Sequence, residues 1–191
     1  MKKITCASLA ALALFNAPAF AEPVTYAIDP THSYPRFEYN HLGFSSQVQR
    51  FNKTSGTIVL DRVAHNASVD ITIDAKSVDT GYSLFNEHLQ GEDFLDTARY
   101  PTITYRSTAV KFDGDKPVSI DGNLTIKGVT KPVTLTVTGF QQMLHPMLRR
   151  DAIGANAFAK IKRSDFNAGK HAPYVSDELT LTFAVEAIKQ Q

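Results

Sequence analysis

The sequence predicts an all-β protein: a closed antiparallel β-barrel of about eight strands with one short helical insertion. Apolar and polar residues alternate along most of the chain after residue 21, which is typical of half-buried strands. These runs are rich in Val, Ile and Thr, and turn residues separate them at the spacing of a meander. A barrel removes the unpaired edges of its sheet, and about eight strands leave room for one small elongated molecule.

The first 21 residues have the pattern of a cleaved secretory signal peptide. A basic start precedes an apolar run that ends at about Phe15, and Ala19-Phe20-Ala21 forms a small-x-small cleavage site. The apolar run is too short to span a bilayer. We therefore expect that residues 1–21 are removed, that residues 22–191 form a single domain, and that this domain works in the periplasm.

The composition of residues 22–191 excludes several classes of site. The sole cysteine, Cys6, lies in the signal peptide, so the mature chain has no disulfide, thiol nucleophile or Cys-ligated metal. The whole chain has 20 Lys and Arg against 19 Asp and Glu, and removal of Lys2 and Lys3 changes its net charge from +1 to −1. Such a balance argues against nucleic-acid binding through bulk charge.

Most of the predicted strands are recognised by one apolar face. In each run, apolar residues recur at every second position and the residues between are mainly Thr or Asp. Turn signals such as Asp113-Gly114-Asp115 and Lys127-Gly128 separate the runs, and Gly128 is expected to adopt a positive φ. The clearest runs lie at residues 56–60, 69–74, 102–106, 120–126, 133–137 and 179–185.

One segment has a helical rather than a two-residue period. Between Ser83 and Gln90 the apolar residues Leu84, Phe85 and Leu89 lie on one side of a helix, with Asn86 and Glu87 on the other. A second helical turn is expected over residues 92–98, ended by Tyr100-Pro101. We predict that this insertion forms a lid on the barrel.

Two alternatives concern the outside of the barrel. An outer-membrane barrel also alternates, but this chain has no Trp, shows no aromatic girdles and ends in Lys189-Gln190-Gln191, which favours a barrel in water.

The stretch Phe140–Asp151 is apolar without clean alternation. It is interpreted as a loop packed on the end of the barrel or as an apolar loop at the barrel mouth that meets lipid.

Aromatic residues are concentrated where a ligand could be enclosed. Phe37, Tyr39 and His41 share one face of a strand, opposite Arg36, Glu38 and Asn40. Aromatic side chains usually belong to cores, but those of a barrel can also line an apolar tube. The other ring-bearing candidates for such a lining are Phe44, Phe51, Phe85, Phe94, Tyr105, Phe158 and Phe166.

No metal or catalytic motif is evident. The six histidines show no HExxH or other compact ligand spacing, so no metal site is predicted. The chain also lacks GxSxG, a phosphate-binding loop and an evident carboxylate pair. We therefore expect a binding protein rather than an enzyme, with no covalent cofactor.

Several short motifs, in their order along the chain, make this sequence resemble the YceI-like family of secreted polyisoprenoid-binding proteins. Asp93-Phe94-Leu95-Asp96 before Tyr100-Pro101 and the run from Leu124 to Lys131 are the most specific parts of the resemblance, which covers nearly the whole mature chain. The other motifs are His41, Ser55-Gly56, Ser77-Val78-Asp79-Thr80, His88-Leu89, Gly122-Asn123, Pro132-Val133 and Arg163-Ser164-Asp165-Phe166-Asn167.

The resemblance implies an extended lipocalin-like barrel that holds a long isoprenoid amphiphile, such as a polyprenyl phosphate or an isoprenoid quinone. It places His41, His88, Asp93 and Arg163 at a polar mouth or in a network that stabilises the motifs. The alternatives are a non-catalytic accessory protein of a quinone-linked membrane system or stress response, and a lipid-modifying enzyme acting through His41 or His88. Transient contact with a membrane or a quinone-using membrane protein, and a homodimer, are possible partnerships.

These observations together give the expected ligand-binding set. It combines the aromatic candidates with the motif residues and with Leu89 of the predicted helix. The set is Phe37, Tyr39, His41, Phe44, Phe51, Phe85, His88, Leu89, Asp93, Phe94, Tyr105, Phe158, Arg163 and Phe166.

Overall fold

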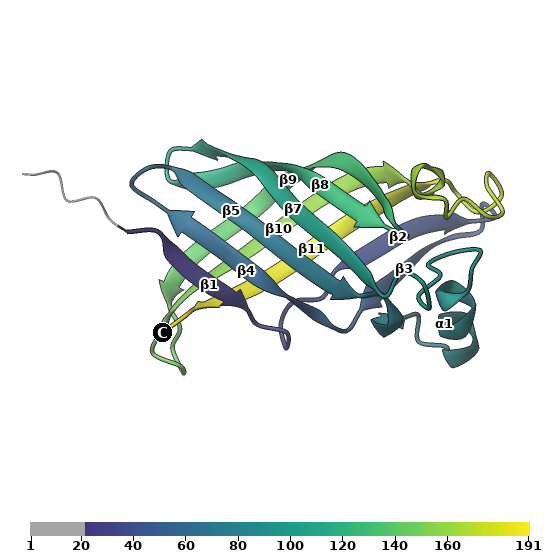
Figure 1. The fold of residues 1–191 in the computed structure, drawn as a ribbon, viewed down its shortest axis with the longest axis horizontal. Coiled ribbons are helices and arrows are strands. Elements are labelled where there is room, and N and C mark those ends of the chain that lie inside the picture. The colour runs from purple at the N-terminus through teal and green to yellow at the C-terminus, as the bar shows by residue number, and fades with distance from the viewer. Residues whose placement is uncertain (1–21) are drawn as a thin grey trace, which may run out of the picture.

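Eight antiparallel strands close into a barrel, with a single α-helix, α1, at one end (Figure 1). The computed structural model describes residues 22–191, so the signal-peptide prediction lies outside the described residues. Around the barrel the order is β1-β4-β5-β7-β8-β9-β10-β11, and pairing of β11 with β1 completes the ring. The predicted fold class is confirmed.

The described residues contain eleven strands, one α-helix and two 3-10 helices. The strands are β1 (Val24–Ile28), β2 (Arg36–His41), β3 (Ser45–Phe51), β4 (Thr54–Asp61), β5 (Asn66–Asp74), β6 (Val78–Asp79), β7 (Thr102–Asp113), β8 (Lys116–Ile126), β9 (Val129–Leu144), β10 (Asp151–Lys162) and β11 (Glu178–Lys189). The helices are η1 (Ala75–Ser77), α1 (Ser83–Gln90) and η2 (Arg163–Phe166).

Strand β11 changes partner along its length, and this divides the barrel into two halves. Its last residues, 187–189, pair with β1, whereas residues 180–182 near its start pair with β2. From β2 the sheet continues through β3 to the short strand β6. The half that contains β2, β3 and β6 is the one that carries α1 (Figure 1).

The predicted helix has the bounds that its period indicated. Leu89 is buried against the barrel, and the helix ends where the backbone N–H of Gly91 bonds to the carbonyl of His88. Residues 92–98 form tight turns, in which the N–H groups of Phe94 and Asp96 both bond to the carbonyl of Gly91. Asp96 has a φ of 46°, which lets the chain turn back towards β7.

The half of the barrel away from α1 is filled by its own side chains. Tyr26 is completely buried, and its hydroxyl donates to Asp151 Oδ2 at 2.7 Å. The Tyr105 hydroxyl lies 2.9 and 3.0 Å from the carbonyl oxygens of Ile120 and Val133. Its ring fits only because residue 122 is glycine, since a Cβ there would lie 2.5 Å from the Tyr105 Cζ.

The stretch Phe140–Asp151 lies in neither of the two expected arrangements. Residues 140–144 continue β9, residue 151 begins β10, and only residues 145–150 form the loop between these strands. This loop is at the end of the barrel opposite α1, so it is not at the mouth near the helix (Figure 1). Its side chains are not packed either, since Met147 and Leu148 are exposed.

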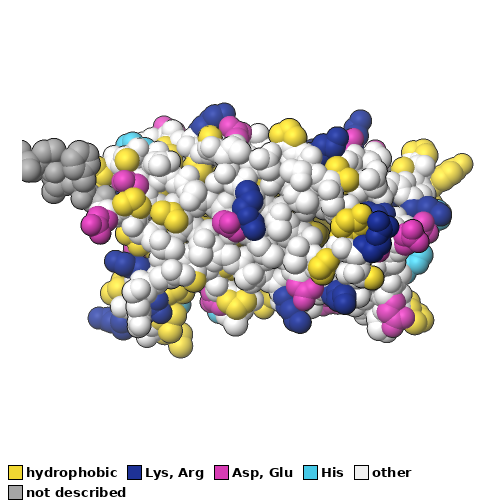
Figure 2. Space-filling view, viewed as in Figure 1, with side chains coloured by type: hydrophobic (Ala, Val, Ile, Leu, Met, Phe, Trp, Pro, Cys, Tyr) yellow, Lys and Arg dark blue, Asp and Glu magenta, His cyan; other side chains and the backbone are white. Residues whose placement is uncertain are grey.

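Charged and hydrophobic side chains both occur along the barrel wall and at its two ends on the face shown (Figure 2). At the α1 end the most exposed hydrophobic side chains are Phe44, between β2 and β3, and Tyr174, between β10 and β11. None of the described helices is both long and apolar enough to cross a membrane.

Replacement of Gly56 by Ala tests the close approach of β4 to β5. Gly56 has a φ of 147°, and a Cβ there would overlap the carbonyl oxygen of Asp70 on the paired strand. We expect Gly56→Ala to lower the free energy of unfolding by about 3 kcal/mol or more in denaturant titrations. Gly114→Ala, at a turn with a φ of 54° and open space around it, should cost only about 1–2 kcal/mol. Equal effects of both changes would contradict this account.

Candidate functional site

The α1 end of the barrel encloses a cavity of about 230 Å³. Its lining comes from β2, β3, α1, the turn after α1, the adjacent ends of β7, β8, β10 and β11, η2, and the segment that follows η2. Most of these side chains are apolar. The cavity therefore occupies the half of the barrel in which β2 replaces β1 as the partner of β11.

Strand β2 supplies one wall of the cavity, as its alternation predicted. Phe37, Tyr39 and His41 all line the cavity. The Phe37 ring packs against the rings of Tyr39 and Phe51, with centroid distances of 6.3 and 5.7 Å. Burial raises the pKa of the Tyr39 hydroxyl, so this group is neutral at physiological pH.

A row of rings along the cavity lining runs from α1 to the segment after η2. His88 packs between Phe85 of α1 and Phe94 of the following turn, with centroid distances of 6.1 and 4.9 Å. Phe94 in turn lies 6.3 Å from the ring of His171. His171 was not among the predicted site residues, because no periodic pattern links it to β2 or α1.

Ten of the predicted residues line the cavity, and the structure adds nine others. Five of the added side chains are aliphatic and lie at strand ends, and the other four lie in the turn after α1 or in the segment after η2. Alternation indicates which strand residues point inward but not which half of the barrel is hollow. The ten are Phe37, Tyr39, His41, Phe51, Phe85, His88, Leu89, Phe94, Arg163 and Phe166. The nine are Leu95, Ile103, Ile126, Ile161, Ala168, His171, Val175, Leu179 and Leu181.

The other four predicted residues do not line the cavity. Phe44 is 87% exposed in the turn between β2 and β3. Asp93 is outside the lining, and its carboxylate pairs with Lys170 at 3.3 Å. Tyr105 belongs to the filled half of the barrel, and Phe158 is exposed on the outer face of β10, whose neighbour Ala159 is buried.

The buried Arg163 guanidinium organises the segment between η2 and β11. Its Nε donates to the carbonyl of Ser176, Nη1 to those of Ala168 and Lys170, and Nη2 to that of Val175, all at 2.7–2.8 Å. Burial lowers the pKa of this group, and the four carbonyl oxygens replace the water that it loses. Arg163 therefore acts mainly as a structural residue of the mouth.

Asp177, the last residue of the same segment, holds the start of η2. Its Oδ1 accepts a hydrogen bond from the backbone N–H of Ser164 at 2.8 Å, and its Oδ2 accepts one from the Ser164 hydroxyl at 2.6 Å. These bonds, led by the one from the hydroxyl, hold the pKa of the Asp177 carboxyl below its usual value. The side chain thus serves as an N-cap for η2 supplied from a distant position.

Lys127 joins three motifs at the rim. It lies with Gly128 in the two-residue turn between β8 and β9, where both residues have positive φ, as predicted for Gly128. The Lys127 Nζ donates to the carbonyl oxygens of Glu92 and Asn167, at 2.6 and 2.7 Å. The turn after α1, the β8–β9 turn and η2 are therefore held together by one ammonium group.

The polar groups of the lining have a consistent chemistry. They are the imidazoles of His41, His88 and His171, the phenol of Tyr39 and the guanidinium of Arg163. No carboxylate occurs among the described side chains that line the cavity. The site can thus enclose an apolar chain and offer hydrogen-bond donors to a polar group at its mouth.

Residues 26–187 match the family model of the YceI-like domain. This match agrees with the barrel and its apolar cavity. Protein YceI of Escherichia coli O157:H7 is 38% identical over 194 residues, which cover 100% of both chains. The chain belongs to the YceI-like family. Protein YceI of Salmonella arizonae is 36% identical over 185 residues, or 96% of both chains. The predicted resemblance is confirmed.

Solved structures share the barrel of this YceI-like protein. BcnA of Burkholderia cenocepacia has a TM-score of 0.70 and 28% identity, covering 84% of this chain and 99% of its own. The YceI protein of Campylobacter jejuni has a TM-score of 0.68 and 29% identity, covering 80% and 90%. A polyisoprenoid binding domain from Saccharophagus degradans, at 18% identity, has a TM-score of 0.66 and covers 87% and 99%, which shows the same fold.

Replacement of Asp177 by Asn tests the cap on η2. The folded-state pKa of Asp177 is lowered, so its stabilisation is present above the unfolded pKa of about 3.9 and is lost as pH falls through the folded value. We expect Asp177→Asn to destabilise the protein by about 1 kcal/mol at pH 7, with the difference shrinking below about pH 4. Denaturant titrations across this pH range measure it. Asp165→Asn, at an exposed neighbouring carboxylate, is the control and should have little effect.

Proposed function

We propose that this YceI-like protein is a non-catalytic carrier of an isoprenoid amphiphile. The apolar cavity at the α1 end supports this proposal best. Within the described chain, the polar groups of its lining can all donate hydrogen bonds, and they include three imidazoles at its mouth. The name of the polyisoprenoid binding domain from Saccharophagus degradans, which shares the fold, supports the same ligand class.

The apolar tail would be held by the rings of β2 and α1. Burial of apolar surface contributes roughly 25 cal/mol per Å² removed from water, so a hydrocarbon tail needs no specific partner to bind. The cavity of about 230 Å³ is smaller than the roughly 300–1,000 Å³ of common ligand pockets. A long tail would therefore have to displace side chains of the lid or extend beyond the mouth.

The polar head would lie at the mouth, near His41, His88 and His171. Arg163 has little capacity for it, because three of its nitrogens already donate to carbonyl oxygens. The imidazoles remain, and they can donate to a phosphate oxygen or a quinone carbonyl. This arrangement fits either a polyprenyl phosphate or an isoprenoid quinone.

The proposal includes a periplasmic location and loading from a membrane. The signal-peptide pattern of residues 1–21 supports the location. The exposed side chains of Leu42, Phe44 and Tyr174 support the loading route, since they project at the end of the barrel that holds the cavity.

An accessory role in a quinone-linked membrane system is a second candidate. The filled half of the barrel favours it, because Tyr26 and Tyr105 are buried there in a packed apolar core rather than lining a cavity. In that case the cavity would be a small hollow, and the exposed mouth would contact a membrane protein.

Native mass spectrometry of protein purified from its own host, followed by organic extraction, tests the carrier function. We expect one isoprenoid lipid per chain, released by the solvent and identified in the extract. A mass without ligand, together with no uptake of added polyprenyl phosphate or isoprenoid quinone, would refute the carrier and favour the accessory role.

Replacement of Phe37 by Asp tests the cavity itself. A carboxylate on this wall would lie among apolar rings without a partner, so we expect a loss of bound lipid of at least about tenfold, as one charge buried without compensation costs several kcal/mol. Phe158→Asp makes the same chemical change on the outer face of β10 and should retain lipid. Circular dichroism must show that both variants are folded. Normal lipid retention by folded Phe37→Asp would place the ligand elsewhere.

A further inference from the structure

A second cluster of polar side chains lies outside the cavity, where β11 changes partner from β1 to β2. The connection between β1 and β2, residues 29–35, is held on β11 at Glu186. The Asp29 N–H donates to the Glu186 carbonyl at 2.9 Å, and the Glu186 N–H donates to the hydroxyl of the fully buried Ser33 at 3.1 Å. The backbone positions of Asp29 and Glu186 are thereby fixed beside each other.

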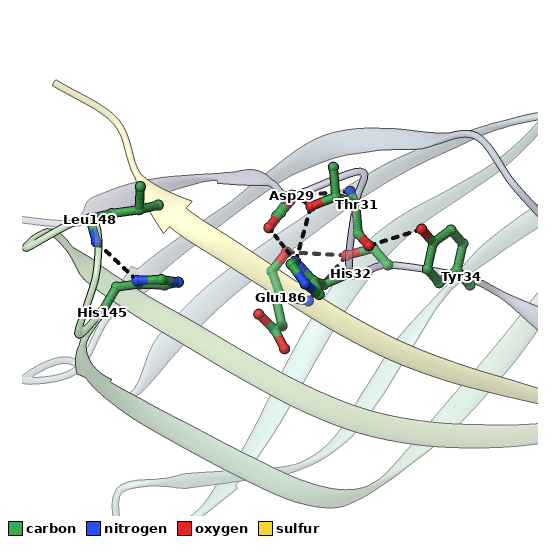
Figure 3. Close-up of polar contacts among 8 residues, drawn as sticks. Asp29, Thr31, His32, Tyr34, His145, Leu148 and Glu186 are labelled. Carbon is green, nitrogen blue, oxygen red and sulfur yellow. Dashed lines mark hydrogen bonds and ion pairs between the residues drawn. The ribbon is translucent and has the colours of Figure 1, made fainter.

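The side chains in this connection are also oriented. The backbone N–H and the hydroxyl of Thr31 both donate to Asp29 Oδ1, at 2.8 and 2.6 Å. The other oxygen, Oδ2, lies 2.8 Å from His32 Nδ1 (Figure 3). Because Thr31 and Asp29 both contact Nδ1, these groups do not form a hydroxyl–imidazole–carboxylate triad, which needs both ring nitrogens.

Glu186 completes a set of three ligand-type groups. One ligand atom each from Asp29, His32 and Glu186 lies within 4.8 Å of the other two. No Lys or Arg side chain within the described part of the chain forms an ion pair with Asp29 or Glu186. Two carboxylates thus lie beside one imidazole without a Lys or Arg partner, and a divalent cation would balance their charge.

We propose that Asp29, His32 and Glu186 form a binding site for a divalent cation of the zinc class. Imidazole nitrogen and carboxylate oxygen are both zinc ligands, at about 2.0–2.2 Å, and tetrahedral ligands at that distance lie about 3.4 Å apart. The Asp29–His32 pair, at 2.8 Å, is within reach of one ion and has to widen slightly to bind it. The exposed side chain of Glu186 also has to move to close the set.

A surface depression of about 350 Å³ adjoins this site. His32 and Glu186 form part of its border, and the small residues Gly139 and Gly154 lie in it. Three protein ligands leave at least one coordination position of zinc free. That position would open towards the depression, where water or a small ligand can complete the coordination.

Zinc binding by the purified, untagged protein tests the proposal. Equilibrium dialysis with ZnCl2 alone should give one tightly bound equivalent per chain. The affinity should fall at least about tenfold in His32→Ala and in Glu186→Gln. Both side chains are exposed, and Glu186→Gln keeps the backbone bonds to Ser33, so these variants are expected to fold. Zinc should also raise the melting temperature of the parent protein more than that of either variant.

His65→Ala is the matched control. His65 pairs with Asp115 at 3.1 Å, as His32 pairs with Asp29, but no third ligand group among residues 22–191 joins it. Its zinc affinity should equal that of the parent. Absence of zinc binding, or binding that is unchanged in both His32→Ala and Glu186→Gln, would overturn the proposal. Binding that is lost only when His41, His88 or His171 is replaced would assign the ion to the cavity mouth and also overturn it.

Discussion

The mouth of this barrel depends on one buried cation. Arg163 satisfies four carbonyl oxygens of a segment that has no regular secondary structure of its own. Without those donors the carbonyl groups would lose their partners near an apolar cavity, and each unpaired group costs about 1–3 kcal/mol. The ring of His171 and the side chain of Val175 line the cavity because this segment is held in place.

The two halves of the barrel use the same strands for different purposes. In the filled half, tyrosines span the interior and bond to backbone or carboxylate groups across it, as Tyr26 and Tyr105 do. In the other half, β2 and β3 replace β1, and the face of Phe37 and Tyr39 lines a cavity together with residues of α1. The side chains that fill the core and those that line the cavity therefore lie largely in different halves along the barrel axis.

Much of this architecture could be predicted, because periodicity reports which face of an element is buried. It identified the cavity face of β2, through Phe37, and the helix over residues 83–90. Parity cannot distinguish a filled section of a barrel from a hollow one, so it could not show that Tyr105 lies outside the cavity lining. Phe158 has the opposite parity to the buried Ala159, a signal that was available. His171 lies in an irregular segment placed by Arg163, a contact that no local pattern reveals.

The partner change of β11 has a consequence for how the chain folds. This last strand pairs with β10, β2 and β1, so neither half of the barrel can close before the final residues are available. The β1–β11 contact joins positions as distant as Tyr26 and Lys189, which gives the closure a high contact order and predicts slow folding. Until then the free edges of β1 and β2 are exposed to other chains, and a chaperone that shields them would limit aggregation.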